Sequence, residues 1–250
     1  MTTEPGRVAL IAGGSRGIGA ATSRLLASRG MRVVVNYRSS VEDAEEVVAS
    51  IHARDGEAMA VRADVDDPPQ VHALVEAVAT RWGAIDVMVN TALIPYAIKS
   101  FQEMSWEEFG GKIHDEMLAA FELTKAVTPA MVDKRYGRIV HVATDLARHP
   151  RAGMMALGSA KAALVQFTRY VAQELGPYGI TVNVVSPGPV DTRIGASRSR
   201  ELEDRIVAST PLRRIARPED VAETIAFFAG DGSGFLTGTC TPVNGGLAMD

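Results

Sequence analysis

Short apolar runs rich in β-branched residues alternate with helical patterns along most of the chain, and this alternation is the strongest constraint on its fold. Several of the runs are apolar on both faces, as strands buried inside a parallel sheet must be. Repeated strand–helix–strand units joined by short loops predict an α/β fold, a Rossmann-like doubly wound parallel sheet with helices on both faces. The expected strands are Val8–Ala12, Arg32–Asn36, Ala58–Arg62, Ile85–Asn90, Arg138–Ala143 and Thr181–Ser186.

Helical spacing fills the segments between these strands. In the third such segment, apolar residues recur at i, i+3, i+4 and i+7, and Pro68 stands where its first turn would begin. Longer helices with apolar faces are expected around Ala119–Met131 and Ser159–Leu175. The uncharged run Gly232–Met249 predicts turns and one more strand, which brings the sheet to about seven strands. Because no linker or repeat interrupts the pattern, residues 1–250 are expected to form one domain.

The composition excludes several classes of protein. Hydrophobic residues make up 46% of the 250 residues and charged residues 22%, which is typical of a globular chain. The net charge of −4 shows no basic excess, so neither nucleic acid nor a membrane surface is an expected partner. A single cysteine, Cys240, excludes an intramolecular disulfide, and no metal site is expected. Met1–Arg7 lacks the positive start and long apolar core of a signal peptide, so we expect a cytoplasmic protein.

A glycine-rich turn directly follows the first expected strand. Its glycines, in the order Gly-x-x-x-Gly-x-Gly, lie between that strand and a helix expected over Ala20–Ser28. Such a turn lets the backbone approach a pyrophosphate, and the helix start offers free N–H groups and the positive end of the helix dipole. In this position the turn predicts a dinucleotide site, with a bare structural turn as the alternative. The residues expected to contact the cofactor here are Gly13, Ser15, Arg16, Gly17, Ile18 and Gly19.

The end of the second strand predicts which dinucleotide binds. An acidic residue about 20 positions beyond the glycines would hold the ribose 2′-hydroxyl of NAD. This chain has no acid there and instead carries Tyr37, Arg38 and Ser39. Arg38 and Ser39, together with Arg16 from the glycine turn, suit a 2′-phosphate, so NADP(H) is favoured over NAD(H). The alternative is that both arginines are solvated surface charges.

Together with further motifs, these features resemble the single-domain short-chain dehydrogenases/reductases, and the 3-oxoacyl carrier-protein reductases in particular. The resemblance extends from Arg7 to Gly246. It implies strand order 3-2-1-4-5-6-7 and a homotetramer in which the Thr237–Gly246 tail packs against a neighbouring subunit. The motifs that carry it are Gly13–Gly19, Ala63-Asp64-Val65, Asn90-Thr91-Ala92, Lys161, Ile180–Asn183, Pro187-Gly188 with Thr192, Thr237-Gly238 and Val243–Gly246.

The resemblance also implies cofactor contacts beyond the glycine turn. Asp64 and Val65 would contact the adenine, and Asn90, Thr91 and Ala92 would line the adenosine ribose. The residues expected around the nicotinamide and its amide are Pro187, Gly188, Val190 and Thr192, and Lys161 is counted with the cofactor-binding residues.

The catalytic positions depart from this family pattern. The family uses a serine, a tyrosine and a lysine, often with an asparagine, and the tyrosine stands four residues before the lysine on one helix face. Lys161 matches the lysine, but the tyrosine position is Leu157, which has no proton to donate. Thr144 stands at the serine position, where its hydroxyl can still bind a carbonyl, and Glu116 stands at the asparagine position. Thr144 and Lys161 are therefore the candidate catalytic residues.

Another residue would have to replace the tyrosine as proton donor. Tyr96, in the loop after the fourth strand, is the favoured substitute, and its plainer interpretation is a pocket wall. Glu116, Asp145 and His149 are the other candidates. Their plainer interpretations are pairing with a lysine, turn formation and simple solvation, respectively.

The segment between Pro189 and Pro218 is rich in arginine. Its positive charges suit an anionic substrate or an acyl-carrier partner, while a solvated helix and loop is the plainer interpretation. The arginines are Arg193, Arg198, Arg200, Arg205, Arg213, Arg214 and Arg217.

Three functions agree with these features. The first is an NADP-dependent oxidoreductase that acts on a small carbonyl or alcohol substrate, including an anionic one, through a non-standard active site. The second is an NADP(H)-binding pseudoenzyme or partner subunit without redox turnover. The third is a lyase or cyclase that reuses the same fold. Loss of a general acid lowers a rate by about 10²–10⁴ and does not abolish it, so the oxidoreductase is favoured.

Overall fold

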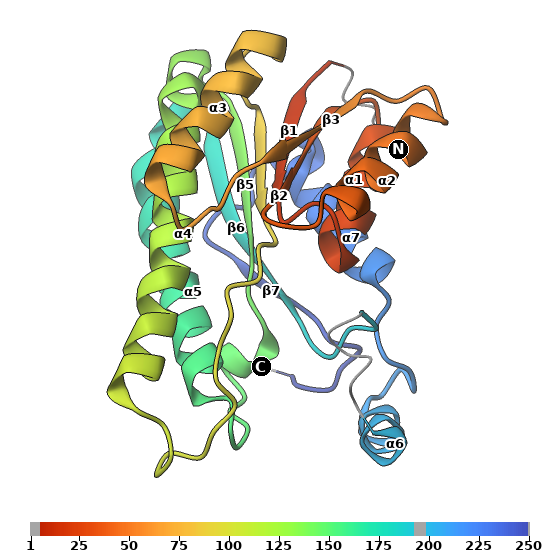
Figure 1. The fold of residues 1–250 in the computed structure, drawn as a ribbon, viewed down its shortest axis with the longest axis vertical. Coiled ribbons are helices and arrows are strands. Elements are labelled where there is room, and N and C mark those ends of the chain that lie inside the picture. Colours follow the sequence, from red (N-terminus) through yellow and green to blue (C-terminus); the bar gives the residue numbers. More distant parts are fainter. Residues whose placement is uncertain (1–5, 193–198, 250) are drawn as a thin grey trace.

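The computed structural model describes residues 6–192 and 199–249. At its centre lies a seven-stranded sheet with the order β3-β2-β1-β4-β5-β6-β7 (Figure 1). Every neighbouring pair of strands is parallel. The expected Rossmann-like doubly wound sheet and its strand order are therefore confirmed.

The strands lie close to their predicted positions. The first six begin or end within two residues of the expected bounds. Five of them are valine-rich and almost entirely buried, whereas in the third, Ala58–Arg62, only Ala58 is buried. The seventh lies in the predicted uncharged run and is only half-buried, so Pro242 is tolerated on this edge strand. The strands are β1 (Val8–Ala12), β2 (Arg32–Tyr37), β3 (Ala58–Arg62), β4 (Val87–Asn90), β5 (Gly137–Val142), β6 (Ile180–Pro187) and β7 (Cys240–Val243).

Helices cover both faces of the sheet. In Figure 1, α3, α4 and α5 lie on one face and α1, α2 and α7 on the other, while α6 lies apart beyond one end of the sheet. Each face has its own apolar core, in which valines of alternate strand positions pack against the helices. The helices are α1 (Gly17–Ser28), α2 (Val41–His52), α3 (Pro68–Trp82), α4 (Trp106–Lys134), α5 (Met155–Leu175), α6 (Arg200–Ser209) and α7 (Pro218–Ala229).

Two helices begin earlier than their apolar faces indicated. Helix α4 starts at Trp106 because Ser105 and Glu108 form a reciprocal capping box, in which each side chain accepts a hydrogen bond from the other residue's backbone N–H. Helix α5 starts at Met155, one turn before the expected Ser159. The earlier starts add about three and a half turns to α4 and about one turn to α5.

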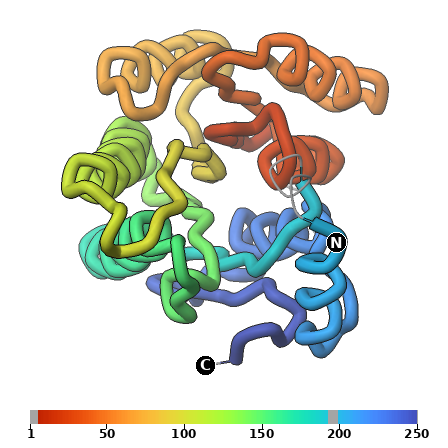
Figure 2. The backbone as a smooth tube through the Cα atoms, turned by 60° about the horizontal axis from the view of Figure 1, so that its bottom comes forward, coloured from red at the N-terminus to blue at the C-terminus, as the bar shows by residue number. Residues whose placement is uncertain are grey.

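The order of the strands reverses between β1 and β4. In an open α/β sheet, ligands bind beyond the carboxyl ends of the strands at such a reversal. The loops that leave β4 and β5 meet at this edge, where a Cβ built on Gly153 would lie 3.2 Å from the Ile98 side chain. Figure 2 shows these two segments, in yellow and green, running beside each other. The fold therefore indicates where a functional site is to be found.

Candidate functional site

A single long cleft follows the carboxyl ends of the first six strands. Its volume is about 710 Å³, which is in the range of small-molecule and cofactor sites. The predicted site residues that line it are Gly13, Ser15, Arg16, Gly17, Ile18, Gly19, Tyr37, Arg38, Ser39, Asp64, Val65, Thr91, Ala92, Tyr96, Thr144, Leu157, Lys161, Pro187, Gly188, Val190 and Thr192. Asn90 and Glu116 are not among its lining residues. The fold thus brings the dinucleotide motifs and the candidate catalytic residues into one space.

The glycine turn forms one end of the cleft. Helix α1 begins at Gly17 with no side-chain cap and no acidic residue in its first turn, so its first N–H groups are available to an anion. Gly13 and Gly17 adopt positive φ angles of 72° and 50°, which favour glycine. A Cβ at Gly19 would lie 2.1 Å from the Gly13 carbonyl oxygen, so this glycine also allows the helix to pack closely against the turn.

Asparagine and threonine side chains hold the glycine turn in place. Asn36 Oδ1 accepts a hydrogen bond of 3.3 Å from the Gly13 N–H, and its Nδ2 donates to the Ala63 carbonyl at 3.0 Å. Thr91 Oγ1 donates to the Ala12 carbonyl at 2.7 Å. Asn90, which is 5% exposed, accepts from the Ala92 N–H through Oδ1 at 3.2 Å. Asn90 therefore shapes the loop that lines the cleft and lies behind its wall.

Two arginines stand near the end of β2. Arg16 Nε lies 3.8 Å from Asp43 Oδ2, and Arg38 Nη1 lies 3.8 Å from Asp64 Oδ2. Both arginine side chains are about half exposed, which leaves these ion pairs weak and able to rearrange. Asp43 and its neighbour on α2, Glu46, line the cleft and were missed by the sequence analysis. The sequence analysis considered only the residues at the end of β2, whereas Asp43 and Glu46 lie on the helix that follows. The amphipathic pattern of α2 was the one sequence feature that pointed to them.

The other end of the cleft holds the candidate catalytic residues. Leu157 lies in the first turn of α5, one turn before Lys161, and only 9% of it is exposed. Thr144 follows β5, and its Oγ1 donates a hydrogen bond of 3.2 Å to Asp145 Oδ1. In this conformation the Thr144 hydroxyl proton is engaged by the Asp145 carboxylate. Tyr96, from the loop after β4, lines the same end.

Behind this end lies a buried network of three charged side chains. Lys161 Nζ donates to Glu116 Oε1 and to the Val142 carbonyl, both at 2.7 Å. Lys112 Nζ donates to Glu116 Oε2 at 2.5 Å and to the Ile94 carbonyl at 2.9 Å. Lys112 and Glu116 lie on α4 four residues apart, so one carboxylate bridges a lysine of its own helix and a lysine of α5. Lys112 was also missed by the sequence analysis.

Burial and charge act in opposite directions within this network. Burial lowers the pKa of Lys112 below its ordinary value, against the opposing effect of Glu116. Burial favours the neutral form of Glu116, but Lys161 and Lys112 together outweigh it and hold the pKa of this carboxyl below its ordinary value. Glu116 is therefore ionised at neutral pH, and it does not act as an acid there.

A buried histidine on β5 adjoins the network. Burial, together with the nearby charge of Lys161, lowers the pKa of His141 to about 3. Its Nε2 lies 3.4 Å from Thr124 Oγ1, and Nδ1 has no hydrogen-bond partner among the described residues. His141 is thus neutral near pH 7.

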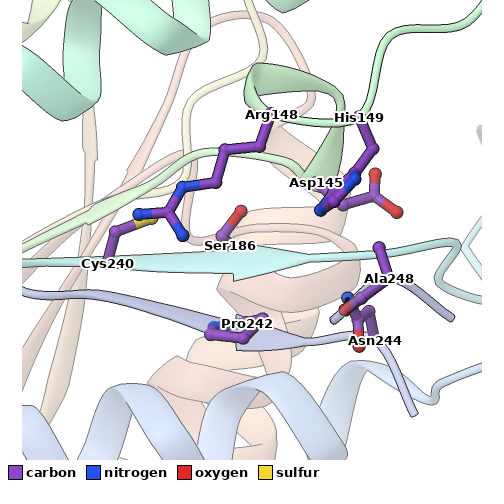
Figure 3. A pocket seen from close by; sticks show the side chains of 8 residues that line it. All are labelled: Asp145, Arg148, His149, Ser186, Cys240, Pro242, Asn244 and Ala248. Carbon is purple, nitrogen blue, oxygen red and sulfur yellow. Dashed lines mark hydrogen bonds between the residues drawn. The ribbon is translucent and has the colours of Figure 1, made fainter. Parts of the chain in front are cut away.

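Two of the proposed substitute acids lie outside the cleft. Figure 3 shows Asp145 and His149 in a separate small pocket between the end of β5, β7 and the C-terminal segment, with Cys240 and Asn244. This pocket has a volume of about 10 Å³, enough for about one water molecule. Burial raises the pKa of Asp145, which is 9% exposed. Neither side chain lines the cleft that holds Lys161.

The described arginines of the segment between Pro189 and Pro218 lie away from the cleft. Arg193 and Arg198 lie outside the described residues. Arg214 forms a two-armed ion pair with Asp220, and Arg200 and Arg205 are exposed on α6. None of the segment's described arginines lines the cleft.

Known proteins resemble the whole chain. A family model described as Enoyl-(Acyl carrier protein) reductase matches residues 12–248. A 3-oxoacyl-(acyl-carrier-protein) reductase of Synechocystis sp. is 38% identical over 250 residues, with all of both chains covered. An acetoacetyl-CoA reductase of Allochromatium vinosum is 35% identical over 244 residues, which cover 97% of this chain and 99% of the relative.

Solved structures agree with these sequences. A short-chain dehydrogenase/reductase from Serratia marcescens has a TM-score of 0.92 and 31% sequence identity, with 99% of this chain and 100% of that chain covered. A dehydrogenase/reductase from Sinorhizobium meliloti has a TM-score of 0.91 and 30% identity, covering 99% of this chain and 97% of its own. The chain therefore belongs to the short-chain dehydrogenase/reductase family of oxidoreductases, and the predicted family is confirmed.

Proposed function

We propose that this protein is an NADP(H)-dependent oxidoreductase that interconverts a carbonyl and an alcohol without the tyrosine its family uses. The observation that carries the proposal is the shared cleft. One end offers an uncapped helix start and two arginines, and the other offers Lys161 and Thr144 beside Leu157. A nicotinamide cofactor lying along the cleft would bring its reactive ring to the lysine.

The residues of the cleft fit a dinucleotide. The N–H groups at the start of α1 suit its pyrophosphate, and the loop from Thr91 to Ala92 together with Asp64 and Val65 would enclose the adenosine. Pro187, Gly188, Val190 and Thr192 would surround the nicotinamide. When bound, this cofactor supplies a hydride, and the protein supplies position, charge and a proton.

The charges near β2 support a preference for the phosphorylated cofactor. Arg16 and Arg38 are half exposed and form only loose ion pairs, so both guanidinium groups can turn to a 2′-phosphate at little cost. Asp43 and Glu46 oppose this preference, since their carboxylates line the same end of the cleft. A guanidinium can bind a phosphate through two parallel N–H donors, and this geometry favours the phosphorylated cofactor despite the two carboxylates.

The substrate class follows from the relatives and from the lining of the cleft. The relatives are named as reductases of 3-oxoacyl-(acyl-carrier-protein) and of acetoacetyl-CoA, which are carbonyl compounds attached to an anionic carrier. The cleft that holds Lys161 is lined by apolar side chains that include Leu93, Ile94, Pro95 and Leu157. A small carbonyl compound, including one on an anionic carrier, is the substrate we propose.

The cofactor proposal is tested by titrating the protein with NADPH and with NADH and following fluorescence or heat. We expect NADPH to bind at least about tenfold more tightly, a difference of about 1.4 kcal/mol. Arg38→Ala should weaken NADPH and leave NADH almost unchanged, while Arg54→Ala, at an exposed position outside the cleft, should affect neither. Equal affinities for the two cofactors would contradict the proposed preference.

The activity is tested by following NADPH absorbance with a panel of ketones that includes acetoacetyl-CoA. Consumption of NADPH with formation of the alcohol would support an oxidoreductase. Tight NADPH binding without turnover on any member of the panel would instead favour a pseudoenzyme or partner subunit, the reading that the missing tyrosine at Leu157 supports.

A further inference from the structure

The buried network of Lys112, Glu116 and Lys161 carries an uneven charge. Glu116 shares its single negative charge between two ammonium groups, one on each carboxylate oxygen. With both lysines protonated, the three side chains hold one positive charge in excess. All three residues are at most 8% exposed, so water screens this excess charge poorly.

The excess charge reaches the cleft through Lys161 alone. A lysine ammonium has three N–H donors, and Lys161 uses two of them, toward Glu116 and the Val142 carbonyl. Lys161 lines the cleft, whereas Lys112 and Glu116 do not. Lys112 uses two donors within the protein, and the Tyr96 ring covers its Nζ at 5.8 Å from the ring centroid. One N–H of Lys161 is thus left for a ligand.

Leu157 offers no hydrogen-bond acceptor to the remaining N–H of Lys161. It lines the cleft one helical turn before Lys161, and its side chain neither donates nor accepts a hydrogen bond. A substrate oxygen can therefore approach the lysine directly.

We propose that Lys112 and Glu116 are positioning residues that keep an unshared positive charge on Lys161, so that Lys161 Nζ itself binds the substrate oxygen and gives it a proton. This inference rests on the proposed carbonyl reduction. The carbonyl carbon accepts a hydride, with its electron pair, from the reduced nicotinamide, and the C=O π bond breaks toward oxygen. That oxygen takes a proton from Lys161 Nζ, and the resulting amine regains a proton from water in the cleft.

The role of Lys112 is to neutralise part of Glu116. Without Lys112, Glu116 would pair with Lys161 alone, the network would carry no net charge, and the Lys161 proton would be held more tightly. Removing the carboxylate charge as well would restore one unshared positive charge. The double variant Lys112→Met/Glu116→Gln is therefore expected to recover what Lys112→Met loses, which two packing defects together would not do.

The first experiment measures the proton affinity of Lys161 in the cofactor-free protein, by competitive acetylation with acetic anhydride at a series of pH values and mass spectrometry. In Lys112→Met, the midpoint for Lys161 should rise by about one pH unit, and in the double variant it should return toward that of the wild type. The other titratable groups that face the network are Asp115 on α4, His141 on β5 and Tyr96. His141 stays neutral throughout this range because burial lowers its pKa to about 3.

The second experiment measures ketone reduction with NADPH. In Lys112→Met, kcat should fall at least about tenfold with little change in KM, and the double variant should regain most of the loss. Lys99→Met removes an exposed lysine paired with Glu108 and should leave both constants unchanged. Lys112→Gln repeats the test if Lys112→Met does not fold.

Three results would overturn the inference. They are an unchanged Lys161 midpoint in Lys112→Met, an unchanged kcat in that variant, and a double variant as slow as the single one. If the wild type reduces no carbonyl compound at all, the proposed function is wrong. The acetylation midpoints of Lys161 would then still show whether the three charges are coupled.

Discussion

Leu157 is the residue whose identity most changes the chemistry of the site. It stands one turn before Lys161 on α5, where the family resemblance predicts a tyrosine, and its side chain has no exchangeable proton. The other two candidate catalytic residues, Lys161 and Thr144, line the same cleft as Leu157. A tyrosine there would both fill the pocket wall and deliver a proton. The leucine fills the wall but cannot deliver a proton.

Replacing Leu157 tests this difference. Leu157→Tyr should raise the rate of NADPH-dependent reduction of small ketones by about 10²–10⁴, the range expected for one positioned acid. The gain should lie toward the lower end because Glu116 occupies one N–H of Lys161. Steady-state rates on a ketone panel measure it, with Leu157→Phe as the control that adds a ring without a hydroxyl. An equal gain in both variants would show that the ring, and not the proton, matters.

His141 makes a prediction about stability. The folded protein keeps this histidine neutral down to a pKa of about 3, whereas the unfolded chain binds a proton below about pH 6.5. Because the unfolded state then holds more protons, the free energy of unfolding falls as the pH falls below 6.5. For this one group, the loss between pH 6.5 and pH 5 is about 2 kcal/mol.

Replacing His141 should remove this loss. His141→Leu also deletes the unpartnered Nδ1, and Thr124 keeps its own hydrogen bond to the Ala120 carbonyl, so the variant should be within about 1 kcal/mol of the wild type at pH 7.5. Urea unfolding at pH 7.5, 6 and 5 measures the difference. His114→Leu, at an exposed position on α4, should retain the wild-type slope. A variant that loses stability below pH 6.5 as steeply as the wild type would contradict the assignment.

At the scale of single elements, the turn between β1 and α1 depends on the absence of side chains. A Cβ at Gly19 would lie 2.1 Å from a backbone oxygen and 2.7 Å from Thr91 Oγ1, neither of which is a flexible side-chain end. Gly19→Ala should therefore move α1, destabilise the protein by about 1–3 kcal/mol and weaken NADPH binding. Thermal unfolding and cofactor titration measure the two effects.

A glycine on another helix provides the matched comparison. A Cβ at Gly111 in α4 meets nothing within 4 Å, so Gly111→Ala should stabilise the protein by about 0.5–1 kcal/mol. The same substitution thus has opposite signs at two helical positions. If Gly19→Ala and Gly111→Ala change stability alike, close packing at the glycine turn is not the reason for a glycine at position 19.

The elements differ in how far the sequence predicts them. The strands and the glycine turn follow from local patterns, since buried parallel strands must be apolar and a sharp turn into a helix needs glycine. The network behind the cleft does not, because Glu116 and Lys161 are 45 residues apart and meet only when α4 packs beside α5. Lys112 had one available signal, its spacing of four residues from Glu116 in the segment that precedes the expected helix Ala119–Met131. The apolar periodicity did not predict the capping box at Ser105, which starts α4 early enough to include Lys112.

At the scale of the whole molecule, one sheet with a core on each face supports the expectation that residues 1–250 form one domain, which we retain as a proposal. Among the helices of the described residues, none is long and apolar enough to cross a bilayer. Large apolar side chains are nevertheless exposed at several places, and two of these areas bear on assembly. Phe121 and Tyr170 lie on α4 and α5 and are 45% and 65% exposed, and Phe235 and Leu236 precede β7.

These two areas lead to the prediction of a homotetramer. Two separate apolar areas on one chain are what dihedral symmetry uses, since each can pair with its own copy across a different twofold axis. Light scattering at micromolar concentration should give about four times the chain mass of 26.6 kDa, and a monomer would refute the prediction. Phe121→Glu should reduce the tetramer to a dimer while the subunit stays folded, because a carboxylate there can pair with Lys125 one turn further along α4. Trp106→Glu is the control, because it places the same charge at an exposed aromatic position at the start of α4, and it should leave the mass unchanged. A loss of mass in both variants would indicate a general effect of charge and not a specific interface.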